Sequence, residues 1–258
     1  MTDTSSSLPR VARLCRYPVK GLSAEPLQTV TLTPAEGLPE DRRFALAQSG
    51  TRFDPANPEW LPKGQFLMLM KNERLALLES RYDAATTTLE IWRSGKRVAR
   101  GVLSSPIGRA VIEDFFAAFM RTEALGKPKL VEAPGHMFSD AREKVVSLIN
   151  LATVADLERV VGRPVDPIRF RGNVYLEGLP AWAEFDWLGR GIAIGDATLR
   201  VARRIPRCPA TDVDPTSGAR DMNIPLTLKS AFGHADLGLY AEVTEGGAIA
   251  VGNDVRLL

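Results

Sequence analysis

The last third of the chain consists of short strand patterns separated by turns, and this feature constrains the fold most. From Gly191 the sequence reads GIAIGDATLRVARRI, and it ends on GLYAEVTEGGAIAVGNDVRLL. Gly246-Gly247 lies between Tyr240–Thr244 and Ala248–Val251 and predicts a β-hairpin, because glycine tolerates the tight turns that join antiparallel strands. We therefore expect this part of the chain to be almost entirely strand and turn.

Earlier segments add more strands. Alternation of apolar and polar residues, or a run of β-branched residues, predicts four of them. These are Val11–Val19, Leu27–Leu32, Arg43–Ala47 and Thr86–Trp92. Residues 51–64, between the third and the fourth, are rich in proline and are expected to form a loop.

Two segments have helical signals. Ser105 and Pro106 suit the N-cap and first position of a helix, which Gly126 and Pro128 would end. An apolar residue recurs every four positions in this helix and predicts its apolar face, formed by Ile107, Val111, Phe115 and Phe119. A second helix is expected from Thr153 to Val161, closed by Gly162 and Pro164. Many short strands with few helices predict an α+β protein, predominantly β: a β-barrel with peripheral helices.

Composition narrows the function classes. The 258 residues are 45% hydrophobic and 25% charged with a net charge of +2, which argues against a dedicated nucleic-acid partner but allows a local anion site. No apolar run is long enough to span a membrane, and residues 1–8 lack a signal-peptide core. Cys15 and Cys208 are too far apart in sequence to indicate a disulfide framework. We expect a cytoplasmic protein without membrane contact.

Cys208 is the residue with the most obvious chemical potential. It lies in the run RRIPRCP, where Arg203, Arg204 and Arg207 precede it within five residues. Fixed positive charge stabilises a thiolate, the form that attacks electrophiles and ligates metals. A buried thiol whose neighbouring arginines face solvent is the alternative from local sequence.

Several common motifs are absent from the sequence. It contains no G-x-S-x-G, P-loop, C-x-x-C or H-E-x-x-H pattern. Gly189-Arg190-Gly191 precedes a strand and not a helix, which favours a turn over a dinucleotide site. His136 and His234 have Asp140 and Asp236 nearby, and surface hydrogen bonds are a more common explanation of such pairs than catalysis.

Four polar clusters remain, each at a turn or at the end of an expected strand. Sites on β-barrels collect at such positions, and together the clusters supply several cations and one thiol, which suits a large anionic ligand. They are Tyr17–Leu22, Glu40–Arg43, Arg169–Asn173 and the segment from Arg203 to Gly218.

Several segments resemble the MOSC superfamily, named for the C-terminal domain of molybdenum-cofactor sulfurase. YPVKGL and GLPEDRRFAL are similar to the N-terminal β-barrel region that often precedes this domain. VSLINLATVADLE, RFRGNVYLEG, RCPATDVDPTSGARD and the C-terminal sequence are similar to the MOSC domain itself. The resemblance covers nearly the whole chain and implies an N-terminal region at 8–125 and a MOSC domain at 126–258, expected to form one compact unit.

The resemblance also implies a cofactor site. In the group that includes the amidoxime-reducing components, the MOSC cysteine ligates molybdenum, and the matching residue here is Cys208. The pterin dithiolene supplies two sulfurs, so one soft thiolate from the protein suffices. The residues implied to hold the molybdenum cofactor (Mo-molybdopterin) are Lys20, Arg42, Ser147, Asn150, Arg169, Arg171, Asn173 and Arg207.

Gly21 and Pro206 depart from the family pattern, and Asp214 matches it. Some relatives have serine where this chain has Gly21 and Pro206, so a side-chain contact there is lost. Asp214 matches the acidic residue of the family's VDP turn and is the second catalytic candidate beside Cys208. It would either orient water or substrate near the metal or build the turn.

The implied activity is reduction of N-hydroxylated compounds. Electrons would come from a separate ferredoxin-like or cytochrome-type protein with its reductase, because two cysteines are too few for a [2Fe–2S] cluster. The alternatives are a sulfur carrier with a Cys208 persulfide and a protein that delivers or binds the cofactor without turnover. Nothing resembles a pyridoxal-phosphate-dependent desulfurase, so pyridoxal phosphate is not expected.

Overall fold

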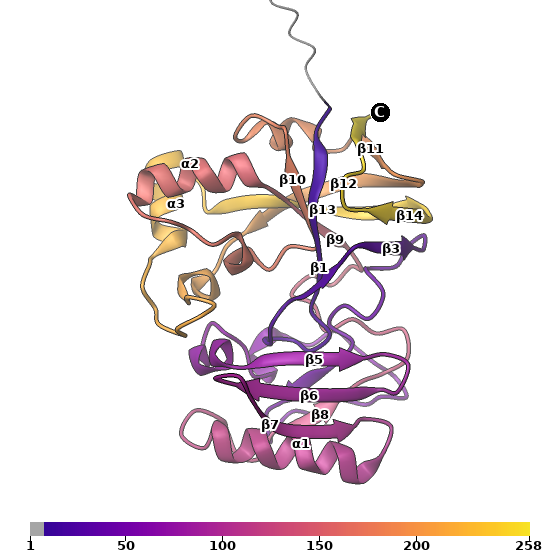
Figure 1. Cartoon of the computed structure of the whole chain (residues 1–258), viewed down its shortest axis with the longest axis vertical. Coiled ribbons are helices and arrows are strands. Elements are labelled where there is room, and N and C mark those ends of the chain that lie inside the picture. Colours follow the sequence, from indigo (N-terminus) through magenta and orange to yellow (C-terminus); the bar gives the residue numbers. More distant parts are fainter. Residues whose placement is uncertain (1–7) are drawn as a thin grey trace, which may run out of the picture.

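The computed structural model describes residues 8–258. Figure 1 shows two layered regions, one above the other, with α1 on the lower region and α2 and α3 on the upper one. The predicted class, α+β and predominantly β, is confirmed, since fifteen strands accompany three α-helices in the described residues. None of these helices is long and apolar enough to cross a membrane.

The strands and helices have the following bounds. The α-helices are α1 (Pro106–Phe119), α2 (Leu151–Val161) and α3 (Ile224–Phe232). The short 3-10 turns are η1 (Lys63–Gln65), η2 (Glu73–Leu77), η3 (Pro167–Phe170), η4 (Ala183–Trp187) and η5 (Pro209–Asp212). The strands are β1 (Arg10–Arg16), β2 (Glu25–Leu27), β3 (Thr29–Leu32), β4 (Ala45–Ala47), β5 (Glu79–Asp83), β6 (Thr88–Arg93), β7 (Lys96–Val102), β8 (Lys129–Val131), β9 (Val146–Asn150), β10 (Val174–Glu177), β11 (Gly191–Ile194), β12 (Ala197–Pro206), β13 (Asp236–Glu245), β14 (Gly247–Ala250) and β15 (Val255–Leu257).

The upper region is built around an eight-stranded sheet in the order β15-β11-β12-β13-β9-β10-β1-β2. Strand β1, from the start of the chain, pairs antiparallel with β10, and β9 runs parallel to β10. Helices α2 and α3 cover one face, where Val154, Leu157 and Leu228 pack on Ile149 and Tyr175 of the sheet. The N-terminal strands are therefore part of the same sheet as the C-terminal strands.

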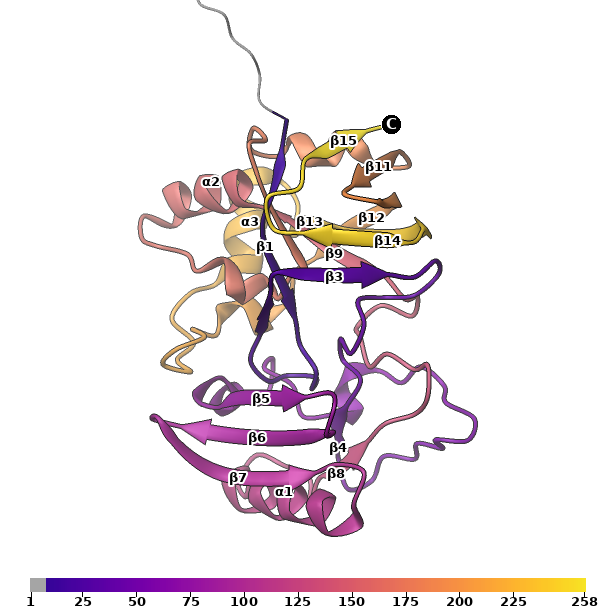
Figure 2. The same cartoon turned by 45° about the vertical axis from the view of Figure 1, so that its right-hand side comes forward.

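The lower region contains a three-stranded sheet, β5-β6-β7, with α1 packed against it, and the two-stranded sheet β4-β8 (Figure 2). The helix lies so close to β7 that a Cβ on Gly108 would be 2.1 Å from the carbonyl oxygen of Val102. Only glycine fits at such a contact, and it turns Gly108, Ile112 and Phe116 toward the sheet.

The predicted apolar face of α1 is correct at Phe119, which is buried, and wrong at Ile107 and Val111. Ile107 is 77% exposed and Val111 is 42% exposed, while Ile112 and Phe116 are fully buried. The helix carries two adjacent apolar stripes, and the glycine contact decides which of them faces the core. The predicted N-cap, Ser105, does precede the helix, although its side chain accepts no capping hydrogen bond from the described residues.

The predicted hairpin at Gly246-Gly247 is also wrong. Strand β13 pairs with β12 and β9, whereas β14 pairs with β3 in a separate two-stranded sheet (Figure 2). Neither glycine has the positive φ that a tight hairpin turn requires. A Cβ on Gly247 would instead lie 2.4 Å from the carbonyl oxygen of Asp196, so glycine is needed here for close backbone packing.

Candidate functional site

A cavity of about 300 Å³ lies between the two regions. Its wall contains seven basic side chains and one acidic side chain, so its electrostatic potential favours an anion. The basic residues are Lys20, Arg42, Lys63, Arg169, Arg171, Arg203 and Arg207, and the acidic one is Asp140.

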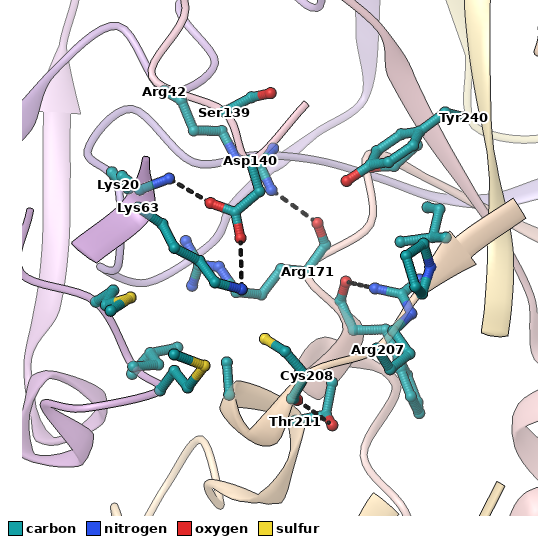
Figure 3. A pocket seen from close by; sticks show the side chains of 18 of the residues that line it. Lys20, Arg42, Lys63, Ser139, Asp140, Arg171, Arg207, Cys208, Thr211 and Tyr240 are labelled. Atoms are coloured by element: carbon teal, nitrogen blue, oxygen red, sulfur yellow. Dashed lines mark hydrogen bonds and ion pairs between the residues drawn. The ribbon is translucent and has the colours of Figure 1, made fainter. Parts of the chain in front are cut away.

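Cys208 lines this cavity at the point where β12 ends and η5 begins. It is half-buried, and its thiol points into the cavity (Figure 3). Its carbonyl oxygen accepts hydrogen bonds from the backbone N–H and the hydroxyl of Thr211, both at 3.0 Å, which fix the turn. Cys15 is instead buried in β1, where burial raises the pKa of its thiol to about 11.

Arg42 and Arg171 both stack on the ring of Tyr17. Their guanidinium carbons lie 4.5 Å and 4.2 Å from the ring centroid, and Arg42 donates a hydrogen bond to the Arg171 carbonyl at 2.9 Å. Burial opposes the charge of Arg42, but Asp41 and Tyr17 outweigh it and raise its pKa. Burial, followed by repulsion from Arg42, lowers the pKa of Arg171 to about 10. One terminal nitrogen of Arg171, Nη2, is buried and has no hydrogen-bond partner among residues 8–258.

Arg207 lies on another side of the cavity (Figure 3). It donates to the carbonyl oxygens of Leu237 (2.7 Å, from Nε) and Phe170 (2.9 Å). Burial lowers its pKa to about 10. Neutral carbonyl oxygens hold it in place without cancelling its charge, so Arg207 and Arg171 both leave positive charge for a ligand to neutralise.

Lys20 and Lys63 bind the two carboxylate oxygens of Asp140 at 2.5 Å and 3.5 Å (Figure 3). Burial lowers the pKa of Lys20, although Asp140 opposes this shift. Burial disfavours ionisation of Asp140, but the two lysines outweigh it and lower its pKa. Two lysines against one carboxylate leave one positive charge in excess, and Lys63 lies near Cys208 (Figure 3).

Ser147 and Asn173 line the cavity but use their polar atoms internally. The Ser147 hydroxyl donates to Asn173 Oδ1 at 2.7 Å, and Asn173 Nδ2 donates to the Cys15 carbonyl at 3.2 Å. These bonds tie β9 and β1 to the segment that presents Arg171. Both residues therefore position the cavity wall.

Arg169 anchors the turn that carries Cys208. Its side chain is 2% exposed and pairs with Asp214 at 3.0 Å and Asp221 at 2.9 Å. It also donates to the Asp212 carbonyl at 3.2 Å. Asp214 does not line the cavity, and its other oxygen accepts from the backbone N–H groups of Thr216 and Ser217. This arrangement matches the turn-building alternative for Asp214.

The structure separates Asn150 from the other implied residues. It is the N-cap of α2, where its side chain accepts from the Ala152 N–H at 3.0 Å and donates to buried Glu184 at 2.7 Å. The histidines are not paired with their neighbouring carboxylates: His234 accepts from the Asp236 backbone N–H, and His136 packs on Phe138. Within residues 8–258, no group of three or more His, Cys, Asp or Glu could hold a metal.

Family comparison accounts for both regions of the chain. The model of the MOSC domain matches residues 133–256, and the model of the MOSC N-terminal beta barrel domain matches residues 8–113. The chain belongs to the MOSC domain family. The MOSC domain supplies Arg169, Arg171, Arg207 and Cys208 to the cavity, and the N-terminal domain supplies Lys20, Arg42 and Lys63.

Curated relatives of this MOSC protein share part of its sequence. Mitochondrial amidoxime-reducing component 1 of Mus musculus is 33% identical over 133 residues, which are 47% of this chain and 38% of that protein. The Homo sapiens protein of the same name is 32% identical over 43% of this chain and 36% of its own length. Mitochondrial amidoxime reducing component 2 of Bos taurus is 25% identical over 55% and 49%. The chain thus spans less than half the length of these relatives.

Two solved structures show weaker likeness. YiiM from Geobacillus stearothermophilus has a TM-score of 0.36 and 23% identity, over 44% of this chain and 53% of that chain. The YUAD protein from Bacillus subtilis has a TM-score of 0.46 and 12% identity, over 97% of this chain and 96% of that chain. Both TM-scores are below 0.5, so the family assignment rests on the sequence matches.

Some cavity residues of this MOSC protein are not suggested as site residues by the sequence. Lys63 comes from the proline-rich segment at 51–64, where one lysine among turn residues gives no functional signal. Asp140 follows His136 closely in sequence but pairs with lysines. The remaining unpredicted lining includes Met68, Leu69, Met70, Met137 and Tyr240.

Proposed function

We propose that this protein is a molybdenum-cofactor-dependent reductase of N-hydroxylated compounds, in which Cys208 is the metal ligand. One observation carries the proposal: a single accessible thiol opens into a cavity whose wall holds seven basic residues and one acidic residue. MOSC domains are associated with this cofactor, and the curated relatives are named for amidoxime reduction.

The chemistry of the cavity fits an anionic cofactor. The buried, unpartnered Nη2 of Arg171 needs an acceptor, and a phosphate oxygen is the acceptor that best matches a guanidinium. Arg42, Arg207 and Lys20 would share this role, each already oriented by neighbouring groups. Ser147, Asn173 and Arg169 would act through these residues by holding the backbone segments that present them.

Cys208 would supply the protein's sulfur ligand. Thiolates are soft ligands that suit a metal already bound by pterin sulfurs. When bound, the cofactor would supply the two-electron chemistry of the reaction. In the net reaction the N–O bond breaks, the nitrogen gains a hydrogen, and two electrons and two protons are consumed as water leaves. A separate ferredoxin-like or cytochrome-type protein would supply the electrons.

Metal content tests the proposal directly. We would express the protein in a molybdenum-cofactor-competent host and measure bound molybdenum and pterin for wild type and Cys208→Ser, with Cys15→Ser as the matched control. Near-stoichiometric molybdenum that is lost only in Cys208→Ser is the expected result. A metal-free protein with a persulfide on Cys208 would instead support the sulfur-carrier alternative.

Activity provides the second test. The molybdenum-loaded protein should reduce benzamidoxime with a chemical reductant such as reduced methyl viologen and should be inactive with NADH alone. Turnover with NADH alone would contradict the need for a separate electron donor.

A further inference from the structure

The cavity has a second kind of wall, which an anionic cofactor does not require. Met68, Leu69, Met70 and Met137 line it beside the basic residues. Met68 is 6% exposed. Leu69, Met70 and Met137 are half-buried, so the side chains of these three are available to a ligand. Methionine is flexible and polarisable, and its sulfur makes favourable contacts with aromatic rings.

Leu69 and Met70 of this apolar wall are held next to the turn that carries Cys208. Hydrogen bonds from one arginine show how close the two segments are. Pro209, the residue after Cys208, and Met70 both accept hydrogen bonds from the guanidinium of Arg220, at 3.0 Å and 2.7 Å.

Arg220 is the link between the two domains at this point. In addition to Pro209 and Met70, it binds the Leu69 carbonyl at 3.1 Å and the Glu73 carboxylate at 3.1 Å. One planar guanidinium thus sets the separation between the Cys208 turn and the methionine wall. Arginine suits this role because its donors are fixed in one rigid fork.

We propose that Met68, Leu69 and Met70 form a substrate subsite for a flat apolar substituent, with Arg220 as its positioning residue. This inference rests on the proposed function, since it assigns the group attached to the reacting N–O unit. The substituent would lie on the thioethers while its N-hydroxyl group faces Cys208. Small N-hydroxylated compounds without such a group would leave the wall in contact with water and bind less well.

Two amidoximes that differ in one substituent test the subsite. Benzamidoxime and acetamidoxime carry the same reacting group, on a phenyl ring and a methyl group. We expect the loaded enzyme to prefer benzamidoxime in kcat/KM by about tenfold or more. Met70→Gln, which keeps the length but not the apolarity of the side chain, should reduce that ratio to about twofold. The matched control is Met222→Gln, outside the cavity, which should leave the ratio unchanged.

Arg220 is tested by the same ratio. Arg220→Gln should raise the KM for benzamidoxime several-fold with little change for acetamidoxime, and Arg220→Lys should restore part of the loss. Equal effects on both substrates, with no rescue by lysine, would contradict a positioning role. Thermal unfolding of each variant would show whether a loss reflects misfolding.

Binding without turnover distinguishes the two proposals. Calorimetric titration of benzamidoxime and acetamidoxime into the enzyme without reductant measures the subsite alone. Tighter binding of benzamidoxime that Met70→Gln abolishes would support the subsite even if no reduction occurred, in which case the proposed function would fail. Reduction of both substrates with equal kcat/KM and equal affinity would overturn the subsite while leaving the proposed function intact.

Discussion

Arg171 shows how a residue can lower the stability of a fold and still serve a ligand. Burial and Arg42 lower its pKa to about 10, well below that of arginine in an unfolded chain. A basic group whose pKa is lower in the folded state than in the unfolded state destabilises the folded state at any pH where the group is charged in both states. The penalty is fully present below pH 10 and fades as the pH rises through the folded pKa toward the unfolded one. An anion bound at Nη2 would remove the penalty.

The first prediction at this scale concerns Arg171→Met. The ligand-free variant should unfold at the same temperature as wild type or higher, because it loses an uncompensated buried charge. Wild type should gain thermal stability with added inorganic phosphate, and Arg171→Met should gain much less. Arg43→Met is the control, since Arg43 pairs with Glu40 and Glu132 and does not line the cavity. An equal phosphate effect in both variants would refute the anion role.

The second prediction concerns Asp140, whose pKa is lowered by Lys20 and Lys63 against the effect of burial. A lowered carboxyl pKa stabilises the fold above the unfolded pKa, and this stability is lost as the pH falls through the folded pKa. Asp140→Asn should therefore reduce the free energy of unfolding at pH 7 by no more than about 1 kcal/mol, because solvent screens a half-exposed carboxylate. Urea unfolding of both proteins should show the difference shrink as the pH falls below the ordinary carboxyl pKa and through the lowered pKa of Asp140; a constant difference would contradict it.

Residue types with unusual chemistry could be found from the sequence, but their surroundings could not. Cys208, Lys20, Arg42 and Arg171 stand out as charged or reactive groups at strand ends, and the structure brings them to one cavity. The family resemblance implies the same role for Asn150, whereas its side chain caps α2. Lys63 and the methionines reach the cavity through irregular segments, whose path depends on contacts distant in sequence.

At the scale of elements, α1 shows why helical periodicity can predict a helix and still misplace part of its buried face. Both apolar stripes repeat at a helical period, so the sequence alone does not rank them. The choice depends on Gly108, where the helix approaches β7 too closely for any side chain. The glycine pair at 246–247 is similar, since its packing partners, Leu32 and Asp196, are distant in sequence.

Two isoleucines of α1, the buried Ile112 and the exposed Ile107, test which face of the helix packs on the sheet. Ile112→Ala should reduce the free energy of unfolding by about 3 kcal/mol, because it opens a cavity in a fully buried position. Ile107→Ala, at a position 77% exposed, should change it by less than about 0.5 kcal/mol. Chemical denaturation of the two variants measures both values. A larger effect at Ile107 would restore the face predicted from periodicity.

At the scale of the whole molecule, the two domains are interleaved and not simply joined. Strands β1 and β2 complete the sheet of the MOSC domain, β3 pairs with β14, and β8 returns to pair with β4. The cavity lies between the domains and takes basic residues from both. The two regions are therefore proposed to form one compact unit despite the sequence boundary expected at residues 125 and 126.

This leads to a prediction about fragments. Residues 126–258 expressed alone should not fold stably, because the edge of β10 and the apolar residues that contact Val11 and Leu14 would be exposed. The whole chain should instead unfold in a single calorimetric transition. Two resolved transitions, or a fragment with dispersed NMR signals, would show that the domains are separable.

The pairing of β1 with β10 has a consequence for folding during synthesis. Arg10 pairs with Glu177 and Thr31 with Ala248, so each N-terminal strand waits for a partner made much later. At ribosomal rates of about 5 to 20 residues per second, the edge of β1 that pairs with β10 stays open for roughly 10 to 30 s after β1 is made, even though its other edge can pair with β2. During that time its unpaired edge is open to other chains. The nascent protein should therefore depend on chaperones that bind extended apolar segments until its last strands emerge.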